Sequence, residues 1–250
     1  MAAALIVDFH VHLGPSPALG VEVGVGEVRR QMVEAGVDLA VVFPFPSMAV
    51  SDPSIVDWVA SQAEASGFLI PFYYAPDDLS PPSDARLRGV KWHWVRGISD
   101  ARSNYEVLRD PRLDSFVDEV ARLKLPILFE EELEFTVMFV ERYADVALVV
   151  PHLGMLGGHP RAFLERLKRF DNVYFDTSLS PAAMVSEFLE ALGAGRLIFG
   201  SDVPFGYMPS ELAKLRSLKL SGEEAEAVLG GNAVRLMGLQ GLRSALRVSP

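Results

Sequence analysis

Short apolar runs alternate with longer amphipathic segments along most of this chain. The runs are rich in β-branched and aromatic residues, which is typical of strands buried on both faces. Alternation of this kind indicates βα units around a parallel sheet. The eight runs are Leu5–His12, Leu39–Phe45, Phe68–Ala75, Gly89–Val95, Pro126–Glu130, Ala147–His152, Val173–Ser178 and Leu197–Asp202.

Helical patterns fill the intervals between the runs. They are predicted at Val25–Ala35, Ser54–Ala65, Tyr105–Leu123, Leu133–Tyr143, Ala162–Arg169, Ala182–Leu192 and Glu211–Leu218. The third interval, Pro76–Arg88, contains Pro81-Pro82 and leaves room for only a turn or two of helix. A last segment, Gly222–Gly238, predicts an extra C-terminal helix with a break at Gly230-Gly231.

Eight strands alternating with helices predict a closed (β/α)8 TIM barrel, an α/β fold. The chain has 250 residues, of which 50% are hydrophobic, and this suits one domain over residues 1–250 with the extra C-terminal helix attached. The alternative is an open doubly wound sheet. It lacks support, because Phe9–Gly14 after the first run has no G-x-G-x-x-G phosphate loop.

Charge and composition limit the partners. The chain has 23 Lys and Arg against 33 Asp and Glu, for a net charge of −10, and its basic residues are scattered singly, so we expect no nucleic-acid partner. No apolar stretch approaches the ~18 residues of a membrane helix, and the start lacks a basic, apolar signal segment. We therefore expect a cytoplasmic protein with a small-molecule substrate and no membrane partner. The sequence is compatible with a homodimer.

Polar residues interrupt the apolar runs where the predicted strands end, which is where barrel enzymes carry their chemistry. In Asp8-Phe9-His10-Val11-His12 the side-chain period of two places Asp8, His10 and His12 on one face. Phe9 and Val11 would then meet the helices, and both imidazoles would point into the mouth of the barrel. The same parity turns Lys91 and His93 inward and the neighbouring Trp residues outward.

Other predicted strands end in Glu130, His152, Asp176 and Asp202, and four of the five His residues stand at strand ends. A lone His at a strand end is usually an ordinary hydrogen-bonding residue. Several imidazoles and carboxylates at one mouth instead suit Zn²⁺, Mn²⁺ or Fe²⁺. Because the chain has no Cys, any metal must be held by His and carboxylate groups.

The ordered set of motifs resembles the amidohydrolase superfamily. The resemblance is to the amidohydrolase-related branch with pyrone-dicarboxylate lactonase and aminocarboxymuconate-semialdehyde decarboxylase. Its carriers are Asp8–His12, Gly89–His93, Pro151–Gly154, Val173–Ser178, Gly200–Asp202 and Gly231–Leu239. The resemblance implies a barrel with one divalent metal per chain, expected to be Zn²⁺ with Mn²⁺ as the alternative.

The resemblance also implies residue roles. His10 and His12 would bind the metal from strand one. Asp202 would be the strand-eight carboxylate, close to the metal and able to exchange a proton. His152 matches the strand-six histidine, which is a metal ligand in some members and a contact of the substrate or transition state in others.

Strand five departs from the family pattern, because Glu130 stands where relatives commonly have a His. Glu130 would ligate the metal or pair with Lys91, or else the metal is lost; the next residue, Glu131, should face outward. Lys91 would contact substrate or Glu130, or carry a carboxylate that bridges two metals. We also predict that His93 contacts substrate. Arg96 and His159 would contact an anionic substrate, or else be exposed loop residues.

Three functions remain open. The first is hydrolysis of a small ester, lactone or amide by a metal-activated water, with Asp202 and His152 as catalytic residues. The second is metal-dependent non-oxidative decarboxylation of a carboxylated ring or muconate-like acid. The third is a catalytically silent barrel that binds a small molecule. A Ser-His-Asp hydrolase is disfavoured, because the chain has no G-x-S-x-G motif.

Overall fold

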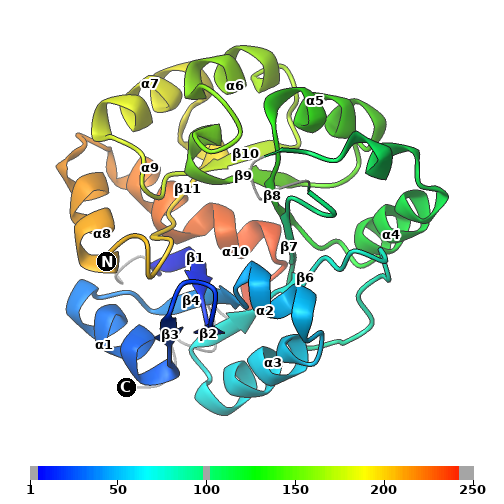
Figure 1. Ribbon diagram of the computed structural model, residues 1–250. Coiled ribbons are helices and arrows are strands. Elements are labelled where there is room, and N and C mark those ends of the chain that lie inside the picture. The colour runs from blue at the N-terminus through cyan, green and yellow to red at the C-terminus, as the bar shows by residue number, and fades with distance from the viewer. Residues whose placement is uncertain (1–4, 98–101, 242–250) are drawn as a thin grey trace.

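The computed structural model describes residues 5–97 and 102–241, and within them parallel strands form a ring enclosed by helices (Figure 1). The ring strands are β1 (Val7–His12), β4 (Leu39–Phe43), β5 (Leu69–Pro71), β6 (Tyr73–Tyr74), β7 (Val90–His93), β8 (Ile127–Glu130), β9 (Leu148–Val150), β10 (Val173–Asp176) and β11 (Leu197–Ile198). They pair in the orders β1-β4-β5 and β6-β7-β8-β9-β10-β11. The two sheets follow the chain order around the ring.

Backbone hydrogen bonds join these two sheets into one barrel. β5 and β6 are parts of one strand interrupted at Phe72, whose N–H donates to Val42 O at 2.9 Å. On the other side, Phe9 N donates to Phe199 O at 2.9 Å and Asp202 N donates to His10 O at 2.7 Å. The segment after β11 thus closes the ring against β1. The predicted (β/α)8 barrel is confirmed, because the nine ring strands of the described residues make eight when β5 and β6 are counted as one.

Most of the helices surround the ring in chain order (Figure 1). They are α1 (Val25–Ala35), α2 (Pro46–Ser51), α3 (Ile55–Ser66), α4 (Pro111–Arg122), α5 (Leu133–Arg142), α6 (Pro160–Leu167), α7 (Ala182–Leu192), α8 (Met208–Ser217), α9 (Gly222–Glu226) and α10 (Asn232–Leu236). The described residues between β6 and β7 contain no helix, as Pro81-Pro82 led us to expect. The predicted helix from Tyr105 divides before Pro111 into a 3₁₀ helix, Tyr105–Arg109, and α4.

The C-terminal helix does not break at Gly230-Gly231, contrary to our expectation. A π-helical segment, Ala227–Gly231, joins α9 to α10. A Cβ on Gly230 would lie 2.1 Å from Leu5 O, so glycine allows the helix to touch the start of the barrel. Ala233, Val234 and Met237 then pack with interior side chains of the strands. The helix closes the N-terminal end of the barrel, and Figure 1 shows α10 across the centre of the ring.

A β-bulge in β1 corrects the predicted side-chain alternation. Asp8 pairs with Ala40 and Val11 pairs with Val42, so β1 has one extra residue between these pairs. As a result Phe9 joins the barrel interior, where its ring meets Phe72 edge-on at 5.3 Å, and does not face the helices. Val11 packs outward as expected. His10 and His12 therefore turn toward the mouth, and the bulge separates them from Asp8, contrary to the expectation that the three side chains share one face.

The core has two layers separated by the strands. The outer layer lies between strands and helices and includes Trp92, whose ring stacks on Phe129 with centroids 5.5 Å apart. The inner layer fills the barrel from α10 up to Phe43. Two segments whose structure the sequence did not predict lie over the mouth: the β2–β3 hairpin (Gly14–Ser16, Val21–Val23) and α2.

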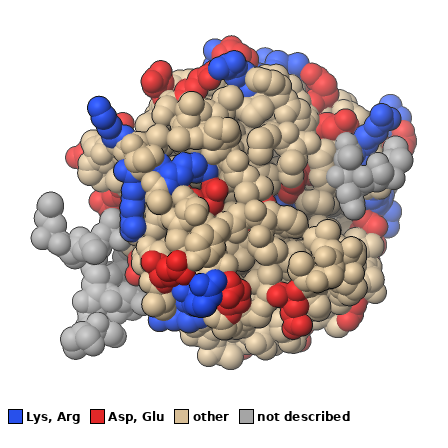
Figure 2. Space-filling model, turned by 60° about the vertical axis from the view of Figure 1, so that its left-hand side comes forward, with Lys and Arg blue, Asp and Glu red and all other residues tan. Residues whose placement is uncertain are grey.

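The outer surface has mixed charge. On the face in Figure 2, Lys and Arg side chains lie beside Asp and Glu and do not form a continuous basic patch. Many of them pair on neighbouring helical turns, as Arg30 does with Glu27 at 2.7 Å and with Glu34 at 2.9 Å. Among the described helices, none combines the length and apolar character needed to cross a membrane.

Candidate metal centre at the mouth of the barrel

Three ligand-type atoms converge where β1 and the segment after β11 end. The Nε2 atoms of His10 and His12 each lie 3.2 Å from Asp202 Oδ1. All three side chains are buried, and the three atoms lie within 4.8 Å of one another. The β1 bulge and the backbone hydrogen bond from Asp202 N to His10 O bring the three side chains together. The arrangement has the donor set of a divalent metal site.

The protonation of His10 follows from its other ring nitrogen. Nδ1 lies 2.6 Å from Oδ2 of Asp176, at the end of β10. Burial alone would raise the pKa of Asp176, but His10, His152 and Ser178 hold it at about 2, so this carboxylate is ionised. We therefore assign the His10 proton to Nδ1, and Nε2 presents a lone pair to Asp202.

The two histidines are neutral in this environment. Burial lowers the pKa of His10, and burial followed by repulsion from Lys91 lowers the pKa of His12 to about 3. Neutral imidazole is the form that binds metals. Asp202 Oδ1 is buried and has no hydrogen-bond partner among the described residues. The lone pair of His10 and an acceptor oxygen thus face each other, and a divalent cation would satisfy both, so the residues fit a metal ion.

His152 stands beside this group, with Nε2 3.7 Å from Asp202 Oδ2. Its Nδ1 lies 2.9 Å from Ser178 Oγ, and Ser178 in turn donates to Asp176 Oδ1 at 2.5 Å. Since the Ser178 proton is directed at Asp176, Ser178 accepts the Nδ1 proton of His152. One carboxylate therefore orients two imidazoles, His10 directly and His152 through a hydroxyl.

The backbone is strained at two of these residues, and a glycine allows a third to reach the site. His152 and Asp202 have φ angles of 54° and 58°, in the left-handed region that non-glycine residues rarely adopt. Such strain persists where surrounding contacts enforce it, often at functional sites. At Gly200, a Cβ would lie 2.8 Å from Asp176 Oδ1, so glycine is needed for Asp176 to reach the site.

Glu130 pairs with Lys91 in the barrel interior. Its Oε2 accepts from Lys91 Nζ at 2.6 Å, and both side chains are buried. Burial would raise the pKa of Glu130, but Lys91 and three nearby histidines keep it well below its ordinary value. Among the roles considered for Glu130, these contacts agree with that of the ion-pair partner of Lys91. Its Oε1 still lies 3.8 Å from His152 Nε2.

Of the four predicted substrate contacts, one lines the cavity above this centre and three do not. His93 lines it, with Nε2 3.8 Å from Glu130 Oε2. Arg96 is turned away and pairs with Asp110 at 2.7 Å. His159 is exposed and caps α6, where Nδ1 accepts from Arg161 N at 3.3 Å. Lys91 is fully buried beneath the cavity and is bound to Glu130.

Asp8, Asp176 and Ser178 are site residues that sequence reasoning did not assign. Asp8 Oδ1 accepts from His10 N at 3.1 Å and Ser201 N at 2.9 Å, so it joins the two strands that carry the ligand-type atoms. The sequence did contain a signal for Asp176. Val173 and Phe175 are apolar and pack outward, and the alternation of side chains along β10 then turns Asp176 inward.

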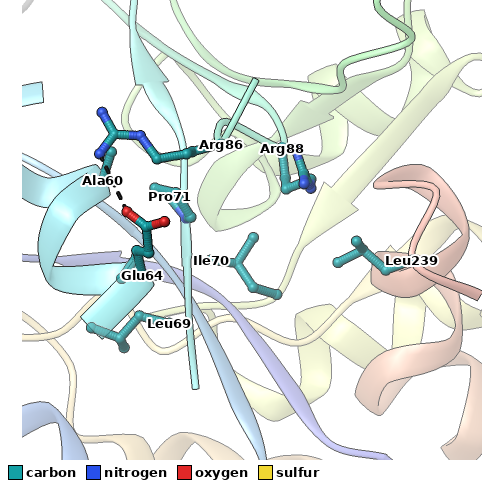
Figure 3. Close-up of a pocket in the computed structure, with 9 residues that line it drawn as sticks. Ala60, Glu64, Leu69, Ile70, Pro71, Arg86, Arg88 and Leu239 are labelled. Carbon is teal, nitrogen blue, oxygen red and sulfur yellow. Dashed lines mark ion pairs between the residues drawn. The ribbon is translucent and has the colours of Figure 1, made fainter. Parts of the chain in front are cut away.

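The cavity over the centre has a volume of about 300 Å³. A second hollow, of about 230 Å³, lies by the start of β5 (Figure 3). It is lined by Leu69, Ile70, Leu239 and other side chains, and two of its charged groups pair with each other, Arg86 Nη1 with Glu64 Oε2 at 3.8 Å. Among the residues that the structure describes, its lining includes no histidine and no unpaired carboxylate. The ligand-type cluster belongs to the cavity at the mouth.

Fold and site define a TIM barrel with a polar centre at the carboxyl ends of its strands. The chain belongs to the amidohydrolase family, whose family model, described as Amidohydrolase, matches residues 7–239. This agrees with the resemblance carried by the sequence motifs. No protein with curated annotation matches the chain.

Solved structures share the fold at low sequence identity. An amidohydrolase from Burkholderia multivorans with bound zinc has a TM-score of 0.77 and 18% identity, with 94% of this chain and 100% of that chain covered. The 5-carboxyvanillate decarboxylase of Sphingomonas paucimobilis has a TM-score of 0.74 at 13% identity, with coverages of 94% and 99%. A putative 2-pyrone-4,6-dicarboxylic acid hydrolase from Pseudomonas putida has a TM-score of 0.71 at 18% identity, with coverages of 95% and 99%.

Proposed function

We propose that this protein is a metal-dependent hydrolase that cleaves a small ester, lactone or amide. The observation that carries the proposal is the contact of Asp202 Oδ1 with the Nε2 atoms of His10 and His12, each at 3.2 Å. Two imidazoles and one carboxylate suit Zn²⁺, with Mn²⁺ as the alternative. The family match and the zinc bound to an amidohydrolase of the same fold support this choice of metal.

A divalent ion held there would act as a Lewis acid toward the substrate carbonyl and would lower the pKa of water. The residues of the chain supply the rest. Asp202 lines the cavity, where its carboxylate can accept a proton from water and return it. Water adds its oxygen to the carbonyl carbon, the bond to the leaving group breaks, and Asp202 transfers the proton from water to the leaving group.

His152 supplies a second polar contact on the substrate side. Its Nε2 carries the lone pair in the tautomer that Ser178 selects, and it faces both Asp202 and Glu130. A base whose orientation is fixed in this way is ready to accept a hydrogen bond from water or substrate. Non-oxidative decarboxylation is the second candidate, because solved structures with this fold include decarboxylases. Release of CO₂ as opposed to a new carboxylic acid distinguishes the two reactions.

Metal content is the first test. Protein purified without chelators should contain about one Zn²⁺ or Mn²⁺ per chain, and chelated protein should regain thermal stability when either ion is added. The double variant His10→Ala/His12→Ala should fold but bind no metal. His159→Ala is the matched control, since this histidine lies outside the cavity, and it should retain full metal content. Chelated wild-type protein that neither rebinds these ions nor gains stability from them would contradict the proposal.

Turnover of Asp202→Asn is the second test. The amide keeps an oxygen for the metal but accepts no proton, so kcat should fall by about 100-fold or more while metal content falls far less. The measurement is kcat on an ester or lactone found by screening, with metal stoichiometry on the same preparation. Near-normal kcat would move the proton transfer to His152. Loss of both metal and fold would make Asp202 structural.

A further inference from the structure

The cavity above the metal centre has apolar walls and an apolar rim. The wall residues are Leu19, Phe45, Pro46, Leu156, Leu179 and Phe205. Three of them, Leu19, Leu156 and Phe205, are 53%, 56% and 54% exposed, although they come from separate loops. Exposed apolar side chains gathered around one opening are typical of a site that binds apolar ligand surface.

Aromatic rings form one side of this wall. Phe45 stacks on His12 with ring centroids 4.7 Å apart, and Phe205 meets the same imidazole edge-on at 5.5 Å. Phe45 and Phe205 lie 6.4 Å apart at 73° to each other. A planar or apolar group in the cavity would pack on these rings directly beside the ligand-type atoms.

A polar compartment adjoins the cavity and shares Pro46 and His93 with it. It has a volume of about 230 Å³, and its polar lining includes Ser47, Ser51 and Asp77. Among the described residues, neither compartment is lined by Lys or Arg. Hydroxyl groups and carboxylates can accept hydrogen bonds from a neutral ligand, but they offer no cation to an anionic one.

Cationic side chains in β7, just after β7 and on α8 are engaged within the protein. Lys91 is bound to Glu130 at 2.6 Å, and Arg96 is bound to Asp110 at 2.7 Å. Lys214 Nζ donates to the Thr177 carbonyl at 2.8 Å and also pairs with Glu211. Each of these cations would have to break a contact made by the folded protein before it could hold an anion.

Carboxylates outnumber the cationic side chains of the centre. Asp176, Glu130 and Asp202 are buried there, and Lys91, the buried cation beside them, already pairs with Glu130 at 2.6 Å. The side chains of the centre therefore offer no unpaired positive charge to a substrate carboxylate. Burying a carboxylate against apolar walls without a counter-charge is strongly unfavourable.

We propose that this cavity takes a small uncharged ester or lactone with an apolar or aromatic group and discriminates against carboxylated substrates. The inference rests on the proposed hydrolase function and names its substrate class. The volume of about 300 Å³ is at the small end for ligand sites and suits a single ring with a short chain. This proposed substrate class differs from our expectation that Arg96 and His159 contact an anionic substrate.

The test compares ligands that differ by one ring carboxylate. With Zn²⁺-loaded protein, kcat/KM is measured for phenyl acetate and 4-acetoxybenzoate. Binding is measured by calorimetry for the related amides acetanilide and 4-acetamidobenzoate. We expect the neutral member of each pair to be favoured by at least about 10-fold, as for an unpaired polar group placed in an apolar site.

A cation placed on the rim should change this preference. Leu156→Arg adds a positive charge at an exposed wall position, so the ratio of the carboxylated to the neutral ligand should rise by at least about 10-fold. Met138→Arg is the matched control. Met138 is 49% exposed on α5 and does not line the cavity, so this change should leave both ratios as in the wild type.

The binding and turnover measurements separate the two proposals. Preferential binding of acetanilide without hydrolysis of either ester would support the substrate class and contradict the hydrolase. Equal or tighter binding of 4-acetamidobenzoate would overturn the substrate class whatever the turnover. Binding of neither amide at millimolar concentration would overturn it as well. So would an equal response of both ratios to Leu156→Arg and Met138→Arg.

Discussion

Asp176 and His10 share a 2.6 Å hydrogen bond between Oδ2 and Nδ1 in the buried mouth of the barrel. This contact fixes the tautomer of His10 and leaves Nε2 free to face Asp202. A carboxylate behind a metal-binding imidazole typically contributes 10- to 100-fold to metal affinity. Asp176 therefore supports the proposed metal site by orienting one of its ligand-type residues.

Asp176→Asn should therefore weaken Zn²⁺ binding by about 10- to 100-fold, because an amide no longer holds the proton on Nδ1 by charge. Competition with a chromophoric chelator measures this affinity. Asp171→Asn, at a fully exposed position shortly before β10, is the control and should leave affinity unchanged. Unchanged affinity in Asp176→Asn would show that the orientation of His10 does not depend on this bond.

Ser178→Ala should disturb His152 without emptying the metal site. The change removes the hydroxyl that lies 2.9 Å from His152 Nδ1, so the ring loses its fixed tautomer. We expect kcat to fall by about 10-fold with a changed pH profile and normal metal content. Ser180→Ala is the control, because Ser180 is buried in the same loop and its Oγ has no hydrogen-bond partner among the described residues. Equal effects of the two changes would indicate a packing role only.

Glu130→Gln should destabilise the barrel. It removes the charge that faces Lys91 at 2.6 Å and leaves a buried ammonium without a counter-charge, at a cost of about 3–5 kcal/mol. Adding Lys91→Met should recover most of that loss, because both charges are then removed. Urea denaturation of the single and double variants measures the coupling. A double variant no more stable than Glu130→Gln would contradict the importance of this ion pair.

Glu131 gives a stability prediction that depends on pH. Burial raises its pKa to about 7, although Oε1 accepts from Trp92 Nε1 at 2.8 Å and from Val95 N at 3.1 Å. Between its unfolded value near 4.3 and about pH 7, the folded protein keeps a proton that the unfolded chain has lost. The free energy of unfolding therefore falls as pH rises through this window.

Glu131→Gln should remove this fall, because the amide does not ionise. Relative to wild type, the variant should gain up to about 2–3 kcal/mol between pH 4.5 and pH 7.5. Urea denaturation at both pH values measures the difference, and Glu190→Gln at an exposed position serves as the control. A difference between Glu131→Gln and wild type that does not change with pH would show that Glu131 titrates as an exposed group.

The sequence by itself determined the barrel and much of its mouth. Alternating runs fix which segments become strands and helices, because buried parallel strands require continuous apolar residues. The alternation of side chains along β7 and β8 predicted that Lys91 and Glu130 point into the barrel and that Trp92 and Glu131 point outward. The structure has this arrangement. These features follow from local periodicity, which any single strand carries in its own sequence.

Tertiary structure alone decided which residues of the site contact one another. The extra residue in β1 exists only relative to the register of β4, so the sequence of β1 could not show that Phe9 turns inward. Choosing Lys91 as the partner of Glu130, and joining Asp176 to His10 and His152, depends on distances between strands far apart in the chain. Such pairings are set by closure of the barrel, and no local pattern encodes them.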